Sequence, residues 1–448
     1  MVERKEKLDR QGPTEGRETY PNRISQNMDG GENSMVSMVG RKKLPALFRL
    51  WFILLITALL VSGCGSSPKA TPDKKTIKVG IVDTYTGGAA VYAQDSLDGF
   101  KLAVKEIAAK GGPTIEFVTR DDEFKPDKST SWAKELVMNE KVDFLAGTTN
   151  SAGSLAVSQF AKENKVPFID WGGMSDKITG AAGHRYVFST LPNTAIIGKA
   201  GAVQLSKTSY KKIWLAGSDY EYGHSVITSL WSNLTTLKPD VEKMGETWWR
   251  VGETDFTPYI NAIRSAKPDV LVVGTGGADM VAFMKALKAT GLTQEIPVWA
   301  HTSYDPATLR PLGDQAPENV MGTNPYLSTY PDTPANKAFV EAFKKEYNRE
   351  PAAFALYGYM GGEFLGQAIQ KAGSTDKEKI IDAMEGLTID TPVGKATLRK
   401  EDHQVAIPMT YGVIAKVDGK ITATDLHTLS PEEIMPSVDE IQKLRVKQ

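Results

Sequence analysis

Few residues of this chain have the types and spacing that covalent or metal chemistry requires. Its five histidines follow no HExxH or other metal-ligand spacing, namely His184, His224, His301, His403 and His427. The sequence also lacks a GxSxG nucleophile elbow and a GxxxxGK-(S/T) phosphate loop. We therefore predict a binding protein with no catalytic residues, no metal site and no cofactor. An enzyme ranks behind the binding functions considered below.

The glycine-rich stretch GTGGAD, from Gly274 to Asp279, is a candidate for dinucleotide binding. It follows a predicted strand and opens a predicted helix, which is the context of a dinucleotide fingerprint. The third glycine of that fingerprint is missing, so we interpret the stretch as a βα turn at the edge of a cleft.

A second turn, GTTNSAGS from Gly147 to Ser154, has residues suited to holding an anion. It supplies small residues and hydroxyls between a predicted strand, VDFLAGT, and the start of a predicted helix. Free N–H groups at a helix N-terminus attract anions and carboxylates. The simplest role for Ser151 in this turn is that of a helix N-cap.

The single cysteine, Cys64, follows an apolar run from Leu50 to Val61 that is preceded by a basic cluster. The run is about 12 residues long, whereas spanning a bilayer takes roughly 20, so the layout indicates a secretory signal. The stretch LVSGC resembles a bacterial lipobox, in which the cysteine is acylated; the alternatives are a plain membrane anchor or a buried thiol. We therefore predict a signal peptide over residues 38–63, lipid on Cys64 and a flexible tether over residues 64–75. The polar residues 1–37 are expected to be a disordered extension or to precede the true start.

The composition limits the class of protein and its partners. The chain has 448 residues, with 53 Lys and Arg against 54 Asp and Glu and a formal net charge of −1. This balance gives no basic field for nucleic acid, which is not an expected partner. The length is ample for two domains, and one cysteine leaves no pair for an internal disulfide.

The elements that position the turns form two βα series. From Thr76 onward, apolar strands such as TIKVGIVD alternate with helical patterns, the first of which places Phe100, Val104 and Ile107 on one face. A second series begins at KKIWLAGSD and has a similar length. Alternating strands and helices predict a parallel sheet covered on both faces, so the fold class is α/β with two Rossmann-like lobes.

Five stretches occur in an order that is typical of one family. They are IKVGIVDTYTGGAAVYAQDSLDGFKLAVKEI, VDFLAGTTNSAGSLAVSQFAKENKVPFID, SDYEYG, ETDFTPYINAIRSAKPDVLVVG and FALYGYMGGEFLGQAI. Together they resemble the leucine/isoleucine/valine-binding-protein family, the type I solute receptors of ABC importers. The resemblance implies two lobes joined by three crossovers, with a ligand cleft between them and closure about a hinge. The expected lobes are 76–191 with 326–404 and 192–325 with 405–427, followed by a tail over 428–448.

The resemblance also implies which residues hold the ligand. Ser151 occupies the position where family members bind the ligand carboxylate through a hydroxyl. Amino-acid binders use the carbonyl of a small residue and a threonine at positions that match Gly172 and Met174, and Met174 has no hydroxyl. Tyr222 matches an aromatic residue that covers the ligand, and Thr275 matches another covering position.

The position that matches the ammonium-binding acid of amino-acid binders carries His301, or Thr302 if the match slips by one residue. No carboxylate follows until Asp305. An ammonium group buried without a partner costs several kcal/mol. A carboxylate or amide without an ammonium group, aromatic ones included, is therefore a comparable alternative to an amino acid. Tyr85 and Phe354 match positions whose rings could stack on such a ligand.

We thus predict an extracytoplasmic, lipid-anchored receptor that captures a small solute by hinge closure. It would act as a monomer and deliver the solute to the permease and ATPase subunits of an ABC importer of the branched-chain amino acid type. The alternative is a sensor lobe that reports ligand occupancy to a signalling partner. The solute stays open between an amino acid and a related amide or aromatic carboxylate.

Overall fold

The computed structural model describes residues 76–446, which belong to one compact unit of the chain. The predicted extension (1–37), signal peptide (38–63), lipidated Cys64 and tether (64–75) lie outside the described residues. Among the described helices, none combines the length and apolar character needed to cross a membrane.

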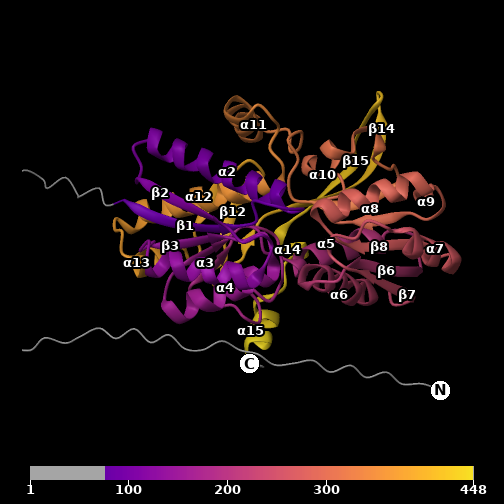
Figure 1. Cartoon of the computed structure of the whole chain (residues 1–448), viewed down its shortest axis with the longest axis horizontal. Coiled ribbons are helices and arrows are strands. Elements are labelled where there is room, and N and C mark those ends of the chain that lie inside the picture. Colours follow the sequence, from indigo (N-terminus) through magenta and orange to yellow (C-terminus); the bar gives the residue numbers. More distant parts are fainter. Residues whose placement is uncertain (1–75, 447–448) are drawn as a thin grey trace, which may run out of the picture. The chain divides into compact units, whose positions relative to one another are not determined.

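The first lobe is built on a parallel five-stranded sheet with the strand order β2-β1-β3-β4-β5. Its strands are apolar runs because helices cover both faces of the sheet. Helices α2 and α12 pack on one face, and α3 and α4 pack on the other (Figure 1). The elements are β1 (Ile77–Asp83), α2 (Ala90–Ala109), β2 (Ile115–Asp121), α3 (Pro126–Met138), β3 (Phe144–Gly147), α4 (Ser151–Asn164), β4 (Phe168–Asp170), β5 (Val187–Ser189), α11 (Pro334–Tyr347), α12 (Ala353–Ala372) and α13 (Lys377–Met384).

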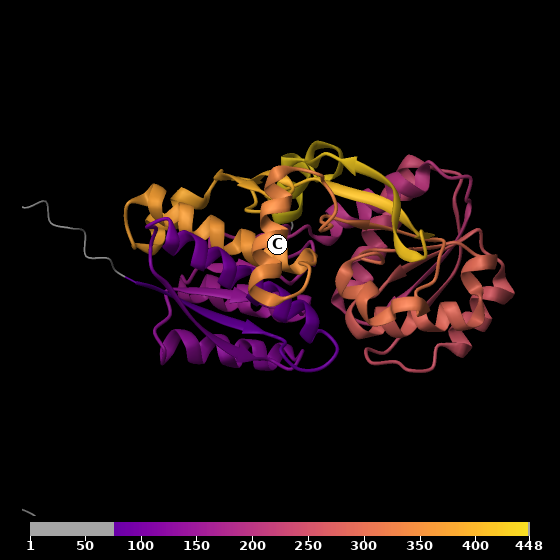
Figure 2. The ribbon, with the colours of Figure 1, turned by 90° about the horizontal axis from the view of Figure 1, so that it is seen from above.

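Helix α12 joins the first lobe from far along the chain, and it lies beside α2 in both views (Figures 1 and 2). Glycines let the two helices approach closely. A Cβ on Gly99 would lie 1.9 Å from the carbonyl oxygen of Ala355, and one on Gly358 would lie 1.9 Å from that of Ser96. The predicted helical face is confirmed in α2, where Phe100 and Ile107 are buried and Val104 is half-buried.

The second lobe contains a seven-stranded sheet with the order β15-β14-β10-β9-β8-β6-β7. The five strands from β10 to β7 are parallel. Strand β14 pairs antiparallel with β10, and β15 pairs antiparallel with β14. Helices α5 and α6 cover one face, and α7 and α8 cover the other. The elements are α5 (Thr194–Ser206), β6 (Lys212–Ser218), α6 (Glu221–Leu237), β7 (Glu242–Trp249), α7 (Thr257–Ala266), β8 (Val270–Gly274), α8 (Gly277–Thr290), α9 (Leu292–Glu295), β9 (Val298–Ala300), α10 (Pro306–Leu312), the short η1 (Gly313–Gln315), β10 (Val320–Asn324), β14 (Met409–Val417) and β15 (Lys420–Leu429).

The chain passes between the lobes three times. The connections run from β5 to α5, from β10 to α11, and from a small sheet to β14. That small sheet consists of β11 (Thr388–Thr391), β12 (Gly394–Leu398) and β13 (Val405–Ala406). The prediction of two Rossmann-like α/β lobes joined by three crossovers is therefore confirmed.

The C-terminal residues return to the first lobe. After β15, the helices α14 (Pro431–Ile434) and α15 (Val438–Val446) follow. The Arg445 guanidinium donates hydrogen bonds to the carbonyl oxygens of Thr179 at 2.8 Å, Gly180 at 3.1 Å and Glu401 at 3.0 Å. The segment expected to be a tail thus begins inside strand β15 and ends packed on the first lobe.

Candidate functional site

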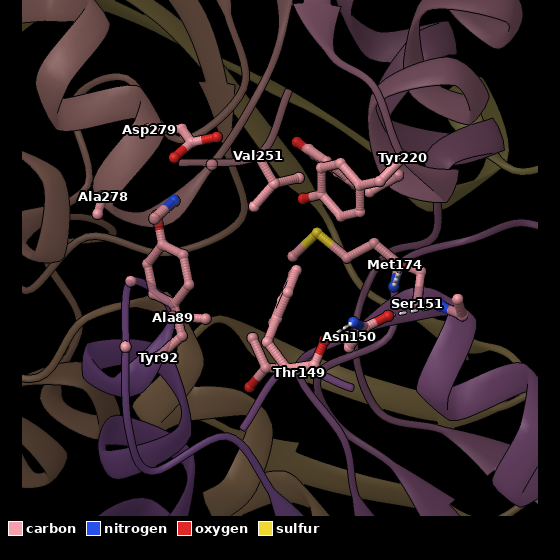
Figure 3. A pocket seen from close by; sticks show the side chains of 18 of the residues that line it. Ala89, Tyr92, Thr149, Asn150, Ser151, Met174, Tyr220, Val251, Ala278 and Asp279 are labelled. Atoms are coloured by element: carbon pink, nitrogen blue, oxygen red, sulfur yellow. Dashed lines mark hydrogen bonds between the residues drawn. The ribbon is translucent and has the colours of Figure 1, made fainter. Parts of the chain in front are cut away.

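A cavity of about 600 Å³ lies between the lobes, at the carboxyl ends of both parallel sheets. The first lobe contributes the loops that follow β1, β2, β3 and β4, together with the starts of α2, α4 and α12. The second lobe contributes the loops that follow β6, β7, β8 and β9. This edge is where α/β sheets bind ligands, because loops and helix N-termini converge there. Figure 3 shows side chains of both lobes facing one another across the cavity.

The N-terminus of α4 opens on this cavity. Asn150 is the N-cap, and its Oδ1 accepts hydrogen bonds from the N–H groups of Ala152 at 2.9 Å and Gly153 at 3.1 Å. Ser151 is the first residue of the helix, and its Oγ accepts a hydrogen bond from the Met174 N–H at 3.1 Å (Figure 3). Among the described residues no acceptor takes the Ser151 hydroxyl proton. The capping role considered for Ser151 therefore belongs to Asn150, and the serine can donate to a ligand.

Two buried aspartates hold the turn before α4 in place. Asp83 Oδ1 accepts hydrogen bonds from the Thr149 N–H and hydroxyl, both at 2.7 Å, and Asp83 Oδ2 accepts one from the Trp171 indole at 3.0 Å. Burial raises the pKa of Asp83 to about 6. Asp170 Oδ1 accepts hydrogen bonds from the Ser154 hydroxyl and the Gly173 N–H, both at 2.9 Å, and burial raises the pKa of Asp170 to about 8. These contacts hold the backbone around Ser151 in place.

Gly172 lies in the loop after β4 and packs directly against the same turn. A Cβ at this position would lie 2.6 Å from the carbonyl oxygen of Thr148 and 2.7 Å from the Cα of Thr149. Only a glycine fits this approach without moving the turn.

Aromatic side chains form much of the cavity wall. Tyr92 and Phe354 stack with their ring centroids 4.3 Å apart, and Tyr92 Oη accepts a hydrogen bond from the Gly277 N–H at 2.9 Å. Phe124 of the first lobe meets Tyr220 of the second at a centroid distance of 5.8 Å, and Tyr220 lies 6.0 Å from Tyr222. Rings from both lobes can therefore contact one flat ligand.

The acidic groups near the cavity are already engaged or exposed. Asp279 accepts hydrogen bonds from the Ser218 hydroxyl at 3.1 Å and from the Gly252 N–H at 3.0 Å. Glu123 is exposed and pairs with lysines. Asp305 is buried at the N-terminus of α10, where its carboxylate accepts from the backbone N–H of Ala307 and is not among the lining residues.

His301 lines the cavity and is buried, with 1% of its surface exposed. Its Nδ1 lies 2.9 Å from the hydroxyl of Thr323, and its Nε2 has no hydrogen-bond partner among the described residues. Burial lowers the pKa of His301 to about 3, so the imidazole is neutral at physiological pH. Thr302, the other residue considered for this position, also lines the cavity.

Six of the eight residues predicted to contact a ligand lie together around this cavity, namely Ser151, Gly172, Met174, Tyr222, His301 and Phe354. The structure does not bring Tyr85 and Thr275 to it. The Thr275 hydroxyl pairs with that of Ser218 at 2.6 Å, and the Tyr85 hydroxyl is buried without a partner among the described residues.

Sequence reasoning missed several lining residues, among them Tyr92, Phe124, Tyr220 and Val251. Two of them had a signal nearby. Tyr92 follows the YTGG turn in the first turn of α2, and Tyr220 stands two residues before Tyr222 in SDYEYG.

Known proteins share this architecture. The sequence profile of the family described as "Periplasmic binding protein" matches residues 76–420 of the chain. The chain belongs to this family. The match covers both lobes, and it confirms the resemblance to the Leu/Ile/Val-binding proteins.

Individual relatives of this periplasmic binding protein include one that is named for amino acids and two that were solved with aromatic acids. The leucine-, isoleucine-, valine-, threonine- and alanine-binding protein of Pseudomonas aeruginosa is 25% identical over 350 residues, which is 76% of this chain and 89% of that protein. A solute-binding protein of an ABC transporter from Rhodopseudomonas palustris, solved with 3,4-dihydroxybenzoic acid, is 27% identical, with a TM-score of 0.72 and coverage of 80% of this chain and 98% of that one. Another from R. palustris, solved with benzoate, is 26% identical, with a TM-score of 0.73 and coverage of 81% and 100%.

Proposed function

We propose that this chain is the substrate-binding component of an ABC importer and that its solute is a small aromatic carboxylate. The observation that carries the proposal is the free Ser151 hydroxyl at the N-terminus of α4, opposite rings that come from both lobes. One ligand can thus contact the two lobes at once. Its contacts would favour the closed state, which is how ligand binding drives hinge closure.

The carboxylate would bind at the start of α4. A hydrogen bond to a charged group contributes about 1.5–3 kcal/mol, and the helix N-terminus adds about 0.3–1 kcal/mol. The Ser151 hydroxyl supplies the donor, and the Asn150 cap keeps the first turn of the helix in place. The ring would lie between Tyr92, Phe354 and Tyr220, where an aromatic pair contributes about 0.5–1.5 kcal/mol beyond the buried area.

Among the described residues that line the cavity, no buried carboxylate lacks hydrogen-bond donors from the protein, which supports an aromatic acid over an amino acid. Of the acidic groups described around the cavity, Asp279 already accepts two hydrogen bonds and Glu123 is exposed. His301 is neutral, so it offers an ammonium group no counter-charge. The two R. palustris relatives were solved with benzoate and dihydroxybenzoate, which agrees with this choice, whereas the P. aeruginosa relative is named for aliphatic amino acids.

The same proposal includes the location and the lobes. We infer that residues 76–191 and 326–404 form one lobe, that 192–325 and 405–427 form the other, and that lipid on Cys64 tethers a monomeric receptor outside the cytoplasmic membrane beside its permease. Lipid chains contribute about 0.8 kcal/mol per buried methylene, so a Cys64→Ser variant should leave the membrane fraction or stay unprocessed. Membrane retention equal to wild type in a variant that has been cleaved at another site would contradict the anchor.

A ligand panel tests the solute class. Benzoate, 4-hydroxybenzoate, benzamide, leucine, isoleucine and valine are compared by thermal shift and then by calorimetry. Binding to the folded state raises the melting temperature by mass action, and we expect benzoates to give the larger shifts. Submicromolar binding of leucine, isoleucine or valine with no benzoate binding would overturn the aromatic assignment and leave the importer role standing. A panel with no binder at all would remove the support for both.

A further inference from the structure

A second hollow lies beside the contact between the starts of α2 and α8, and it shares Gly87, Gly88, Tyr92, Gly277 and Ala278 with the lining of the ligand cavity. It has a volume of about 590 Å³, and both lobes line it. Val91 comes from the first lobe, and Ala278, Val281, Ala282 and Pro311 come from the second. We call this hollow the inter-lobe groove.

The inter-lobe groove depends on closure of the lobes. The Ala278 N–H donates a hydrogen bond to the carbonyl oxygen of Gly88 at 3.0 Å, and the Gly277 N–H donates one to Tyr92 Oη at 2.9 Å. These bonds join the start of α8 to the start of α2 and hold the two walls together. Rotation about the hinge separates the walls, so the complete groove exists only in the closed receptor.

The groove combines exposed apolar surface with unpaired positive charge. Val91 is 37% exposed, which makes it one of the more exposed large apolar side chains among residues 76–446. Lys285 and Arg310 line the groove and are exposed, and within the described chain neither forms a salt bridge. Arg310 reaches only the backbone carbonyl oxygen of Glu350, at 3.4 Å. None of the residues that line the groove is acidic.

We propose that the inter-lobe groove is the docking site for an acidic, partly apolar segment on the outer face of the permease, which thereby recognises the closed receptor. The charge of the groove selects an acidic partner, since opposite potentials match across interfaces and steer encounter. The apolar stripe from Val91 to Pro311 gives that partner surface to bury. This inference rests on the proposed importer function, because it needs a permease.

Charge reversal tests the docking site. A Lys285→Glu/Arg310→Glu variant is compared with wild type for stimulation of the permease ATPase in proteoliposomes, at saturating solute. The receptor concentration for half-maximal stimulation should rise at least about tenfold, since like charges across an interface cost several kcal/mol. The control variant Lys134→Glu/Lys288→Glu makes the same change in net charge at exposed lysines outside the groove and should shift that concentration by less than about threefold.

The dissociation constant for the solute, measured by calorimetry, should be the same in wild type and both variants. Equal stimulation by the reversed and control variants would overturn the docking site and leave the importer role intact. A wild-type receptor that binds solute yet never stimulates the ATPase would overturn both. Raising the salt concentration should weaken wild-type stimulation and narrow the difference between the variants.

Cross-linking gives an independent readout. A thiol-reactive photo-cross-linker on Val91→Cys should form an adduct with a permease subunit when solute is present. Wild type, whose single cysteine is Cys64, sets the background, and Leu237→Cys, 42% exposed at the end of α6, is the matched control. Adducts that form equally well at residue 237, or that join two copies of this receptor at residue 91, would refute the proposal.

Discussion

Replacing Ser151 by alanine removes the Oγ atom, which accepts a hydrogen bond from the protein and can donate one to a ligand. The Ser151 Oγ accepts a hydrogen bond from the Met174 N–H at 3.1 Å, and its own proton is available to a ligand. Ser151 as a residue is 2% exposed, so water does not easily replace its hydroxyl in the variant. Asn150 still caps α4 in the variant, and the helix should therefore keep its start.

Two losses follow from this geometry. A hydrogen bond to a carboxylate contributes about 1.5–3 kcal/mol, so the dissociation constant for benzoate should rise about ten- to a hundredfold. The Met174 N–H loses its acceptor, and an unsatisfied buried donor costs about 1–3 kcal/mol of unfolding free energy. Calorimetry measures the first loss, and urea unfolding of the ligand-free protein measures the second. The affinity loss for neutral benzamide should be smaller than that for benzoate, because a charged acceptor forms the stronger bond.

The matched control is Ser158→Ala, on the same helix. Ser158 is also 2% exposed as a residue, and its hydroxyl lies 2.9 Å from the His184 Nε2, but it does not line the cavity. This variant should lose stability without losing affinity. Benzoate affinity in Ser151→Ala within twofold of wild type would refute the assignment of the carboxylate to α4.

Three further changes test the rest of the site. Gly172→Ala should weaken binding of every solute and lower stability by about 1–3 kcal/mol, because the new Cβ would lie 2.6 Å from the Thr148 carbonyl oxygen; a variant with wild-type affinity would contradict this. His301→Glu should raise the affinity for leucine relative to that for benzoate by about ten- to a hundredfold, because it adds a buried counter-charge. Competition calorimetry measures the ratio of the two affinities, and a ratio equal to that of wild type would contradict this expectation. Asp170 holds a proton in the folded state up to a pKa of about 8, whereas the unfolded value is about 3.9. The contribution of Asp170 to stability is therefore complete below about pH 4 and is lost as the pH rises through 8. Asp170→Asn should accordingly gain stability relative to wild type between pH 5 and pH 8, as measured by urea unfolding. A difference in unfolding free energy that stays constant over this range would refute the expectation.

The sheet strands were predictable where the chain is buried on both faces. The run IKVGIVD became β1, whose residues are almost all buried, because a central parallel strand needs apolar residues on both sides. Strands as short as β5, with three residues, and β13, with two, leave no such run. Their pairing depends on neighbours that lie far away in the sequence, so local patterns cannot reveal them.

A site residue was predictable from the sequence where backbone contacts of a turn determine its position. It was less predictable where its role depends on the direction in which its side chain points. Ser151 is the first residue of α4, and Gly172 packs against the turn that precedes this helix, so backbone contacts place both residues at the cleft. The choice between Tyr85 and Tyr92 depends on where α2 begins, which is Ala90 in the structure. Thr275 and Gly276 are consecutive residues of one turn, and which of them faces the cavity depends on the backbone dihedral angles of that turn. Element boundaries are the least certain part of such predictions, and these residues lie at boundaries.

The packing of α12 on α2 sets the order in which the protein can be completed. The first sheet is synthesised early, yet the helix that covers one of its faces follows the whole parallel part of the second sheet. Until α12 has emerged, the part of α2 around Gly99 and Ala103, which packs directly on α12, has no partner. Such exposed apolar surface attracts chaperones and favours aggregation. The second sheet likewise lacks β14 and β15 until late in synthesis. A chain that stops at Asn324 therefore has two incomplete lobes and cannot enclose a solute between them.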